Sequence, residues 1–276
     1  MKTYIIDAFT DQPFSGNPAA VCILESEMSD TTLQAIANEI NLSETAFIRQ
    51  IGDIQNGYSI RYFTPTVEID FCGHATLAAA KFVQHDLGTP PARFITKKGL
   101  TLKTVSLGQD IELHFPLYNT TQIVPNQDLL EAFDIVNPVA VKFNKDLDML
   151  LIEVEDKKTL TGLCPDFRKA KEITGRIKEV VVTTRSKEKE FDFYSRCFCP
   201  WIGIDEDPVT GAAHSVLAKY WGDLLGKTEM NAYQLSQRGG FMKLHILDNN
   251  TLKVYGKAVI VFEGKIVIDQ FKNPLD

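Results

Sequence analysis

The chain has 276 residues, of which 44% are hydrophobic, 10% aromatic and 24% charged, so it is not disordered and can bury a sizeable core. Its 36 acidic and 29 basic residues give a net charge of -7, which argues against nucleic acid as a partner. Early acidic residues interrupt any signal-peptide core, and no apolar run approaches the roughly 18 residues of a membrane span. We therefore expect no membrane association.

The cysteines are scattered along the chain and odd in number. This arrangement suits a reducing compartment better than a disulfide framework. We therefore expect a cytoplasmic protein with five free thiols, at Cys22, Cys72, Cys164, Cys197 and Cys199.

Short runs rich in β-branched and aromatic residues predict strands along the whole chain, with no linker or low-complexity segment between them. In the first half the expected strands are Thr3–Phe9, Ala19–Leu24, Thr45–Gln50, Tyr58–Phe63, Ala92–Thr96 and Ile111–Phe115, with one helix at Gly73–Asp86. In the second half they are Val139–Phe143, Met149–Glu153, Glu179–Thr184, Phe191–Phe198, Ala232–Gln237, Met242–Ile246, Leu252–Val254 and Ala258–Phe262, with one helix at Gly211–Leu225.

Both expected helices are apolar on most faces, which favours burial of each helix by its own sheet. A short pattern precedes each of them: RYFTP stands before GHATLAAA, and RCFCP stands before GAAHSVLA. The repeat predicts two similar domains joined near Leu117–Val124. We expect one domain at 1–117, for which the tail 265–276 is a candidate completion, and a second at 124–264.

Each helix opens with a glycine, Gly73 or Gly211. Helix N-termini leave backbone N–H groups unpaired, so two of them facing one cleft would bind an anionic small molecule such as a carboxylate. Without a Cβ, a glycine lets such a ligand approach the backbone closely. The alternative is that these glycines only relieve crowding between helix and loop.

The loop before the first helix combines a thiol, an imidazole and carboxylates. At the helix start, the dipole disfavours an imidazolium and could keep His74 neutral, able to donate or accept a proton. The same terminus could stabilise a Cys72 thiolate. The alternatives are a hydrogen-bonded structural histidine and a buried apolar cysteine.

Two carboxylates outside that loop are further candidates. Glu44 begins an apolar strand next to Ser43, and partial desolvation there would raise its pKa and suit a proton shuttle. The alternative is a capping Ser43 or a solvated Glu44. Asp207 precedes Pro208, a combination that alone predicts a helix N-cap followed by the first helical residue.

No resident metal is expected. The acid run 205–207 has no matching set of ligands elsewhere, and the pair at Cys197 and Cys199 lacks an obvious fourth zinc ligand. The dinucleotide fingerprint, the phosphate loop, the zinc-protease motif and the nucleophile elbow are also missing from the sequence.

Five segments, taken together and in this order, resemble the PhzF family of phenazine biosynthesis: DAFTDQPFSGNPAAVC, NLSETAFI, RYFTPTVEIDFCGHATLAAA, GIDEDPVTGAAHSVLAKYW and QLSQRGG. The resemblance implies an α+β, diaminopimelate epimerase-like fold: two pseudo-symmetric domains, each a β-sheet rolled around a central α-helix, with the active site between them. It also implies a homodimer, which nothing else in the sequence indicates.

The characterised member of that family isomerises trans-2,3-dihydro-3-hydroxyanthranilate without a cofactor. When the roles of its catalytic residues are carried over to this sequence, the resemblance implies that Glu44 is the proton shuttle. It also implies that His74 and Asp207 orient the substrate and tune its protonation. Ser43, Cys72, Gly73, Gly211 and Ala212 are then the expected substrate-binding residues. The sequence departs from the family at Cys72, where the phenazine enzyme has a small unreactive residue and epimerases of this fold have an acid/base cysteine. The second epimerase cysteine is absent.

Three functions follow as hypotheses. The leading one is a cofactor-independent isomerase of a small carboxylated metabolite. The second is an amino-acid epimerase or racemase in which Cys72 works against a carboxylate, and the third is a non-catalytic protein that binds a small molecule.

Overall fold

The computed structural model describes residues 1–52, 57–88, 92–173 and 175–268. The chain forms two compact units: unit 1 contains Met1–His114 and the residues from Tyr255 onward, and unit 2 contains Phe115–Val254. Of the predicted tail 265–276, residues 269–276 lie outside the described residues. The division into independent domains at 1–117 and 124–264 stays a prediction, because the compactness of the two units does not test whether either part folds alone.

Unit 1 is built mainly from strands. Strand β1 pairs antiparallel with β18 and β2, β2 pairs parallel with β3, β3 pairs antiparallel with β4, and β4 pairs antiparallel with β5 and parallel with β6. Its elements are β1 (Lys2–Ala8), β2 (Asn17–Ile23), α1 (Asp30–Ile40), β3 (Glu44–Gln50), β4 (Gly57–Phe63), β5 (Glu68–Ile69), α2 (Gly73–Leu87), β6 (Ala92–Thr96), β7 (Thr101–Leu107), β8 (Asp110–Pro116, which ends in unit 2) and β18 (Ala258–Lys265).

Unit 2 repeats this order of pairings. Strand β10 pairs antiparallel with β11, β11 parallel with β12, β12 antiparallel with β13, and β13 antiparallel with β14 and parallel with β15. Its elements are β9 (Thr121–Gln122), α3 (Gln127–Ala132), β10 (Ala140–Asn144), β11 (Met149–Glu153), α4 (Lys157–Gly162), α5 (Phe167–Glu172), β12 (Glu179–Arg185), β13 (Phe193–Cys199), η1 (Pro200–Ile202), β14 (Ile204–Asp207), α6 (Gly211–Leu225), β15 (Glu229–Gln234), β16 (Gly240–Ile246) and β17 (Thr251–Gly256, which ends in unit 1).

The expected mixture of many strands and few helices is confirmed: in the described ranges there are 18 strands and six α-helices. Every predicted strand overlaps an observed one, and the two predicted helices are α2 and α6. The sequence prediction missed four strands, β5, β7, β9 and β14, all short or polar. The recurring pairings agree with the sequence repeat, while a symmetry relation between the units stays a prediction.

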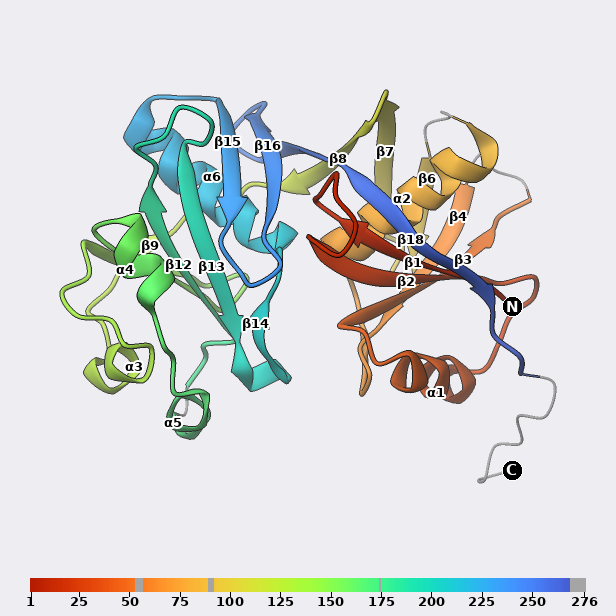
Figure 1. Cartoon of the computed structure of the whole chain (residues 1–276), viewed down its shortest axis with the longest axis horizontal. Helices are drawn as coiled ribbons and strands as arrows, with labels where there is room; N and C mark the ends of the chain where they lie inside the picture. Colours follow the sequence, from red (N-terminus) through yellow and green to blue (C-terminus); the bar gives the residue numbers. More distant parts are fainter. Residues whose placement is uncertain (53–56, 89–91, 174, 269–276) are drawn as a thin grey trace. The chain divides into compact units, whose positions relative to one another are not determined.

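The two long helices are buried, as their all-round apolar character predicts. Helix α2 packs against β1, β2, β3, β6, β7 and β18, and Figure 1 shows it among these strands of unit 1. Leu77 and Ala78, in its middle, are fully buried. In unit 2, helix α6 buries Trp221, whose indole N–H donates to the Thr183 hydroxyl over 2.9 Å. Full burial of an indole requires such a partner.

Helix α1 was not predicted, although both of its caps can be read in the sequence. Ser29 is the N-cap and accepts from the Thr32 backbone N–H, while Asn41 ends the helix in the left-handed conformation. Leu33, Ile36 and Ala37 form the buried side of α1. They pack on the face of the sheet opposite α2 (Figure 1), so α1 shields the strand that carries Glu44.

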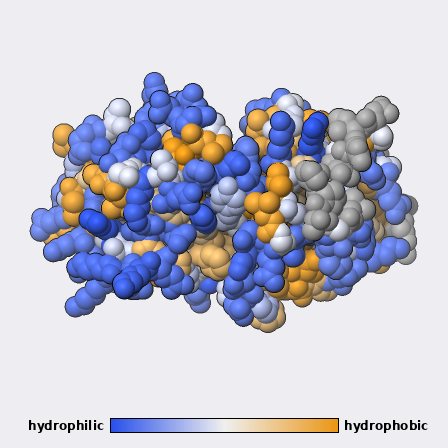
Figure 2. All heavy atoms as spheres, turned by 90° about the horizontal axis from the view of Figure 1, so that it is seen from above, coloured by the Kyte–Doolittle hydropathy of each residue, from blue (hydrophilic) through white to orange (hydrophobic). Residues whose placement is uncertain are grey.

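The surface seen in Figure 2 is largely hydrophilic on both units, with apolar side chains in small separate groups. Isolated apolar side chains are normal on soluble proteins and identify no partner surface by themselves. Among the described residues, no helix combines the length and apolar character needed to span a bilayer. All five cysteines are free, as expected, and four of them are buried.

Candidate active site

Glu44, Cys72 and His74 come together in unit 1. Glu44 is the first residue of β3, and Cys72 and His74 flank the start of α2, which packs on that strand. The Nε2 atom of His74 lies 2.9 Å from Oε2 of Glu44. The two residues are 8% (Glu44) and 4% (His74) exposed, so the pair is shielded from water. The alternative of a solvated Glu44 is therefore wrong.

The ionisation of this pair differs from the expectation. Burial acts to raise the pKa of Glu44, but the charge and contact of His74, together with Ser43, lower it overall. Burial likewise acts to lower the pKa of His74, but its interactions with Cys72 and Glu44 raise it well above the usual value. The directions of the two shifts favour the ion-paired form, a carboxylate beside an imidazolium, in which mutual attraction opposes desolvation and the helix dipole.

Cys72 is the N-cap residue of α2, and its side chain makes no capping hydrogen bond. Its Sγ lies 3.4 Å from Nδ1 of His74. Burial, with the charge of Glu44, raises the pKa of Cys72 against the opposing effect of His74. Cys72 is therefore a protonated thiol, and the expected stabilisation of a thiolate by the helix terminus is not what the structure shows.

Asn17 also belongs to this cluster, although the sequence analysis missed it. It is fully buried at the start of β2, and its side-chain amide lies 3.1 Å from Nδ1 of His74. The atom at this distance is the amide nitrogen Nδ2, which donates when Nδ1 carries no proton, whereas an imidazolium requires the amide oxygen in its place. Ser43 Oγ lies 3.5 Å from the Asn17 Oδ1 position. The signal in the sequence that could have identified Asn17 is an amide side chain directly before a proline, at the start of an apolar strand.

The hydroxyl groups of Thr76 and Tyr62 hold the first turn of α2. The Thr76 hydroxyl donates to the carbonyl of Cys72 over 2.6 Å, and the Tyr62 hydroxyl lies 2.6 Å from Thr76 Oγ1. The N-cap side chain makes no hydrogen bond to the helix, so Cys72 does not occupy the backbone N–H groups of the first turn. Their role in binding the substrate stays a prediction.

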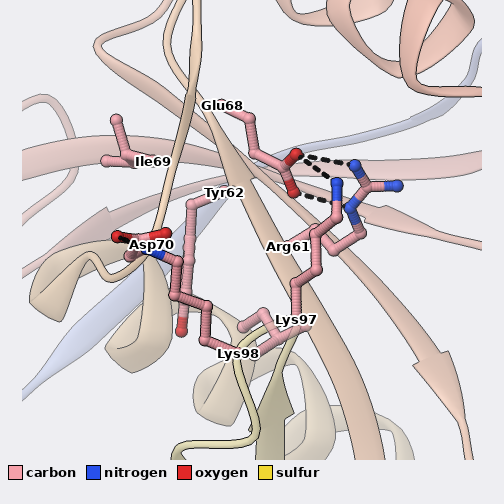
Figure 3. A pocket seen from close by; sticks show the side chains of 8 residues that line it. Arg61, Tyr62, Glu68, Ile69, Asp70, Lys97 and Lys98 are labelled. Carbon is pink, nitrogen blue, oxygen red and sulfur yellow. Dashed lines mark hydrogen bonds and ion pairs between the residues drawn. The ribbon is translucent and has the colours of Figure 1, made fainter.

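The carboxylates of the loop before α2 lie in ion pairs. Arg61 donates twice to Glu68, over 2.7 and 2.8 Å, and Lys97 approaches Glu68 at 2.9 Å. Lys98 pairs with Asp70 at 2.7 Å. Figure 3 shows these side chains around a cavity of about 280 Å³, in which each acid faces a base. Both carboxylates of this loop therefore have basic partners.

Asp207 lies in unit 2, at the end of β14. It is not the N-cap of α6, because that helix begins at Gly211 with Thr210 as its N-cap. The Thr210 hydroxyl donates to Asp207 Oδ2 over 2.5 Å, and Gln234 donates to the Asp207 carbonyl over 2.6 Å. The Thr210 backbone N–H donates to Gln234 Oε1 over 2.9 Å. The predicted N-cap at Asp207 is therefore wrong, because Asp207 ends the extended strand β14 and Gln234 bonds both to it and to Thr210.

The start of α6 contains a second buried histidine. His214 donates from Nδ1 to the Thr210 carbonyl over 2.7 Å, and burial lowers its pKa to about 4. Its ring stacks on Phe193 at a centroid distance of 6.0 Å. Gly211 and Ala212 precede it as the first helical residues. Their expected role in substrate binding, like that of Asp207, stays a prediction.

Potential metal ligands also converge in unit 1. One ligand atom each of Glu44, Cys72 and His74 lies within 4.8 Å of the others. In unit 2, Cys197 and Cys199 are buried along β13, and burial raises the pKa of Cys197 well above its usual value. Neither cysteine belongs to a ligand cluster among the described residues. The expectation of no resident metal stays a prediction.

Three comparisons place this chain among known proteins. Residues 6–264 match the PhzC-PhzF family model, described as phenazine biosynthesis-like protein. An uncharacterized isomerase of Halalkalibacterium halodurans is 42% identical over 96% of this chain and 98% of its own length. A PhzC/PhzF protein from Clostridium difficile shares 35% identity, with a TM-score of 0.88 over 97% of this chain and 100% of that chain. A probable proline racemase from Agrobacterium radiobacter K84 shares the fold, with 9% identity and a TM-score of 0.64 over 99% of this chain and 94% of that chain.

Proposed function

We propose that this chain, which belongs to the phenazine biosynthesis-like family, is a cofactor-independent isomerase that moves a proton within a small carboxylated metabolite. The observation that carries the proposal is the buried contact of 2.9 Å between Glu44 and His74. Such a pair supplies a base, the ionised carboxylate of Glu44, and an acid, the imidazolium of His74. Both can reach one substrate in a site that is shielded from water.

The proposed reaction is balanced without any oxidant or reductant. Glu44 takes a proton from a carbon of the substrate, and the electron pair of that C–H bond moves into the conjugated system. His74 stabilises the negative charge that develops, because its pKa is raised and it stays protonated. Glu44 then returns the same proton to a different carbon, which leaves the enzyme unchanged.

We assign substrate binding to the start of α2. The backbone N–H groups of Gly73 and His74 are suited to a carboxylate, with Ser43 and Cys72 at the edge of the same cluster. Asp207, Gly211 and Ala212 belong to unit 2, and their part in the reaction is carried by the family resemblance instead of by a contact. The pseudo-symmetric domain arrangement and a homodimer are proposed on the same basis.

The first experiment identifies a substrate. Purified protein is screened for thermal stabilisation by cyclic and amino carboxylic acids, since a ligand that binds only the folded state must raise the apparent stability. Ligands that stabilise it are then incubated in deuterium oxide, and their protons are followed by NMR. Exchange or rearrangement at carbon supports the proposal, whereas ligands that bind without either support a binding protein.

The decisive variant is Glu44→Gln, which keeps the shape and removes the base. We expect turnover to fall about 10²–10⁴-fold, the usual contribution of general acid–base catalysis. Glu112→Gln is the matched control, because Glu112 is also buried in unit 1 and lies 2.7 Å from a histidine, His114. Wild-type turnover in Glu44→Gln, or equal losses in both variants, would refute the shuttle role.

An epimerase is the second candidate, favoured by the contact of 3.4 Å between the Cys72 thiol and His74. A protonated thiol and an ionised Glu44 are one acid and one base, which inversion at a carbon requires. In this case Cys72→Ala stops the entry of solvent deuterium at the α-carbon of a bound amino acid. Undiminished exchange in Cys72→Ala would exclude the thiol.

A further inference from the structure

We propose that Glu44, Cys72 and His74 bind Zn²⁺, and that the bound ion inhibits the enzyme. The binding follows from the arrangement of the three side chains alone. The inhibition rests on the proposed function, because it requires that the same residues carry out the proton transfer. The ion is an inhibitor in this proposal, and the reaction itself needs no metal.

The three donor atoms are grouped closely enough to converge on one ion. Zn–N and Zn–O bonds of about 2.0–2.2 Å and Zn–S bonds of about 2.3 Å place neighbouring ligands about 3.3–3.6 Å apart. In the structure Nε2 of His74 lies 2.9 Å from Oε2 of Glu44 and 3.8 Å from Sγ of Cys72. All three atoms lie within 4.8 Å of one another, and Sγ is nearer to Nδ1 than to Nε2 of His74, so admitting the ion requires shifts of about 1 Å or more, chiefly of the Cys72 side chain.

A second observation points to a ligand at this place. Oε2 of Glu44 is buried, and it faces the ring of His74 at 2.9 Å. A buried carboxylate needs a cationic partner, and Zn²⁺ can take that place when the ring gives up its proton. Asn17 contacts the other ring nitrogen at 3.1 Å and thus holds Nε2 toward the ion. Such outer contacts orient the histidine ligands of metal sites.

The donor types select the ion. A thiolate, an imidazole and one carboxylate suit Zn²⁺, whereas Mg²⁺ and Ca²⁺ prefer sets of oxygen ligands. On binding, Sγ of Cys72 and Nε2 of His74 each form a bond to the metal and release one proton to the buffer. Three protein ligands leave a fourth position for water or a substrate carboxylate.

Inhibition follows from the identity of the bound atoms. Oε2 of Glu44 is the oxygen beside His74, and Nε2 of His74 is the nitrogen that faces it. With both atoms bound to Zn²⁺, Glu44 cannot take a proton from the substrate at that oxygen. His74 likewise loses the N–H that faces the carboxylate. The inhibition should therefore be reversed by a chelator.

The binding experiment uses the metal-free protein in a Cys164→Ser background, because Cys164 is exposed and would bind metals by itself. Co²⁺ replaces Zn²⁺ as the probe, since a Co²⁺–thiolate bond gives a near-ultraviolet charge-transfer band. We expect one equivalent of Co²⁺ to produce this band and one equivalent of Zn²⁺ to abolish it. A chromophoric chelator then gives the Zn²⁺ affinity by competition.

Variants test the assignment. Cys72→Ser should abolish the band, and Glu44→Gln and His74→Asn should each weaken Zn²⁺ binding by more than the about 10–100-fold expected of an outer contact such as Asn17→Ala. Cys22→Ser is the matched control for a buried thiol in the same unit and should leave binding unchanged. Absence of stoichiometric binding in the folded Cys164→Ser protein, or a band that survives Cys72→Ser, would overturn the site.

The inhibition experiment is read separately. Once a substrate is known, Zn²⁺ should inhibit turnover with a constant equal to its dissociation constant, and EDTA should restore the activity. If the isomerase proposal fails, the Co²⁺ band and the Zn²⁺ affinity still decide the metal site. If Zn²⁺ binds as described and full activity remains, the inhibitory half of the proposal is wrong.

Discussion

The starts of helices α2 and α6 are built on the same plan but carry different chemistry. In both, an arginine of the preceding strand pairs with a glutamate of the next short strand, Arg61 with Glu68 and Arg196 with Glu206. In both, the fourth residue after the N-cap donates to the N-cap carbonyl, Thr76 in α2 and His214 in α6. The repeated sequence pattern thus encodes a repeated backbone arrangement.

The difference arises at a single helical position. The second residue of α2 is His74, whereas the second residue of α6 is Ala212. A glutamate begins the equivalent strand in both units, Glu44 in β3 and Glu179 in β12. In unit 1 that glutamate has a histidine from the second helical position beside it, whereas the second position of α6 is an alanine. The ion pair, and with it the proposed base, therefore depends on the histidine and not on the fold.

The largest effect should separate the two histidines. His74→Asn should lower turnover about 10²–10⁴-fold, because it removes the group that keeps Glu44 ionised and stabilises charge on the substrate. His214→Asn should change turnover by less than about tenfold, since His214 is neutral and bonded within its own helix. Steady-state kinetics on both variants makes the comparison. Equal losses would mean that the two helix starts are not distinct in function.

The stability of the protein should depend on pH in opposite ways through the two histidines. The folded pKa of His214 is lowered to about 4 from 6.5, so the unfolded chain binds the extra proton between these values and stability falls as the pH drops. The loss is about 3 kcal/mol in full. The folded pKa of His74 is raised, so its stabilisation is complete below about pH 6.5 and is lost as the pH rises through the folded value.

Urea unfolding between pH 4 and pH 9 tests these signs. His214→Asn should flatten the acid side of the stability curve, and His74→Asn should flatten the alkaline side. The exposed His85 provides the control for exchanging a histidine for asparagine, in His85→Asn. An acid side that keeps its slope in His214→Asn would contradict a buried neutral ring.

The sequence determines part of this picture and leaves out another part for physical reasons. The apolar runs from Gly73 and from Gly211 predicted both central helices, because burial on all sides leaves a pattern in the residues themselves. The ionisation of Glu44 was predicted in the wrong direction, since it depends on a partner distant in the chain. Asn17 was missed for the same reason: its importance lies in its contact with His74.

The arginine pairs should differ in stability. Arg196 also donates to the carbonyls of Leu160 and Leu163, so it holds the end of α4 in addition to Glu206. Arg196→Met should cost about 2–3 kcal/mol, because it leaves buried acceptors unpaired. Arg61→Met should cost about 1–2 kcal/mol, since Lys97 still faces Glu68. Equal urea midpoints for the two variants would show that the carbonyl contacts contribute nothing.

Effects of similar size concern the hydroxyls that hold the start of α2, where α6 uses a histidine instead. Thr76→Val should cost about 2 kcal/mol, because it removes the bond to the Cys72 carbonyl and leaves the fully buried Tyr62 hydroxyl without a partner. Tyr62→Phe should cost about 1 kcal/mol, since Thr76 keeps its bond to that carbonyl.

The double variant should be less destabilised than the sum of the two single variants, because the Tyr62 hydroxyl that would lack a partner is removed as well. Urea midpoints measure all three, with Tyr4→Phe as the control for loss of a tyrosine hydroxyl elsewhere in unit 1. Strict additivity would mean that the two hydroxyls act independently and do not fix the helix start together.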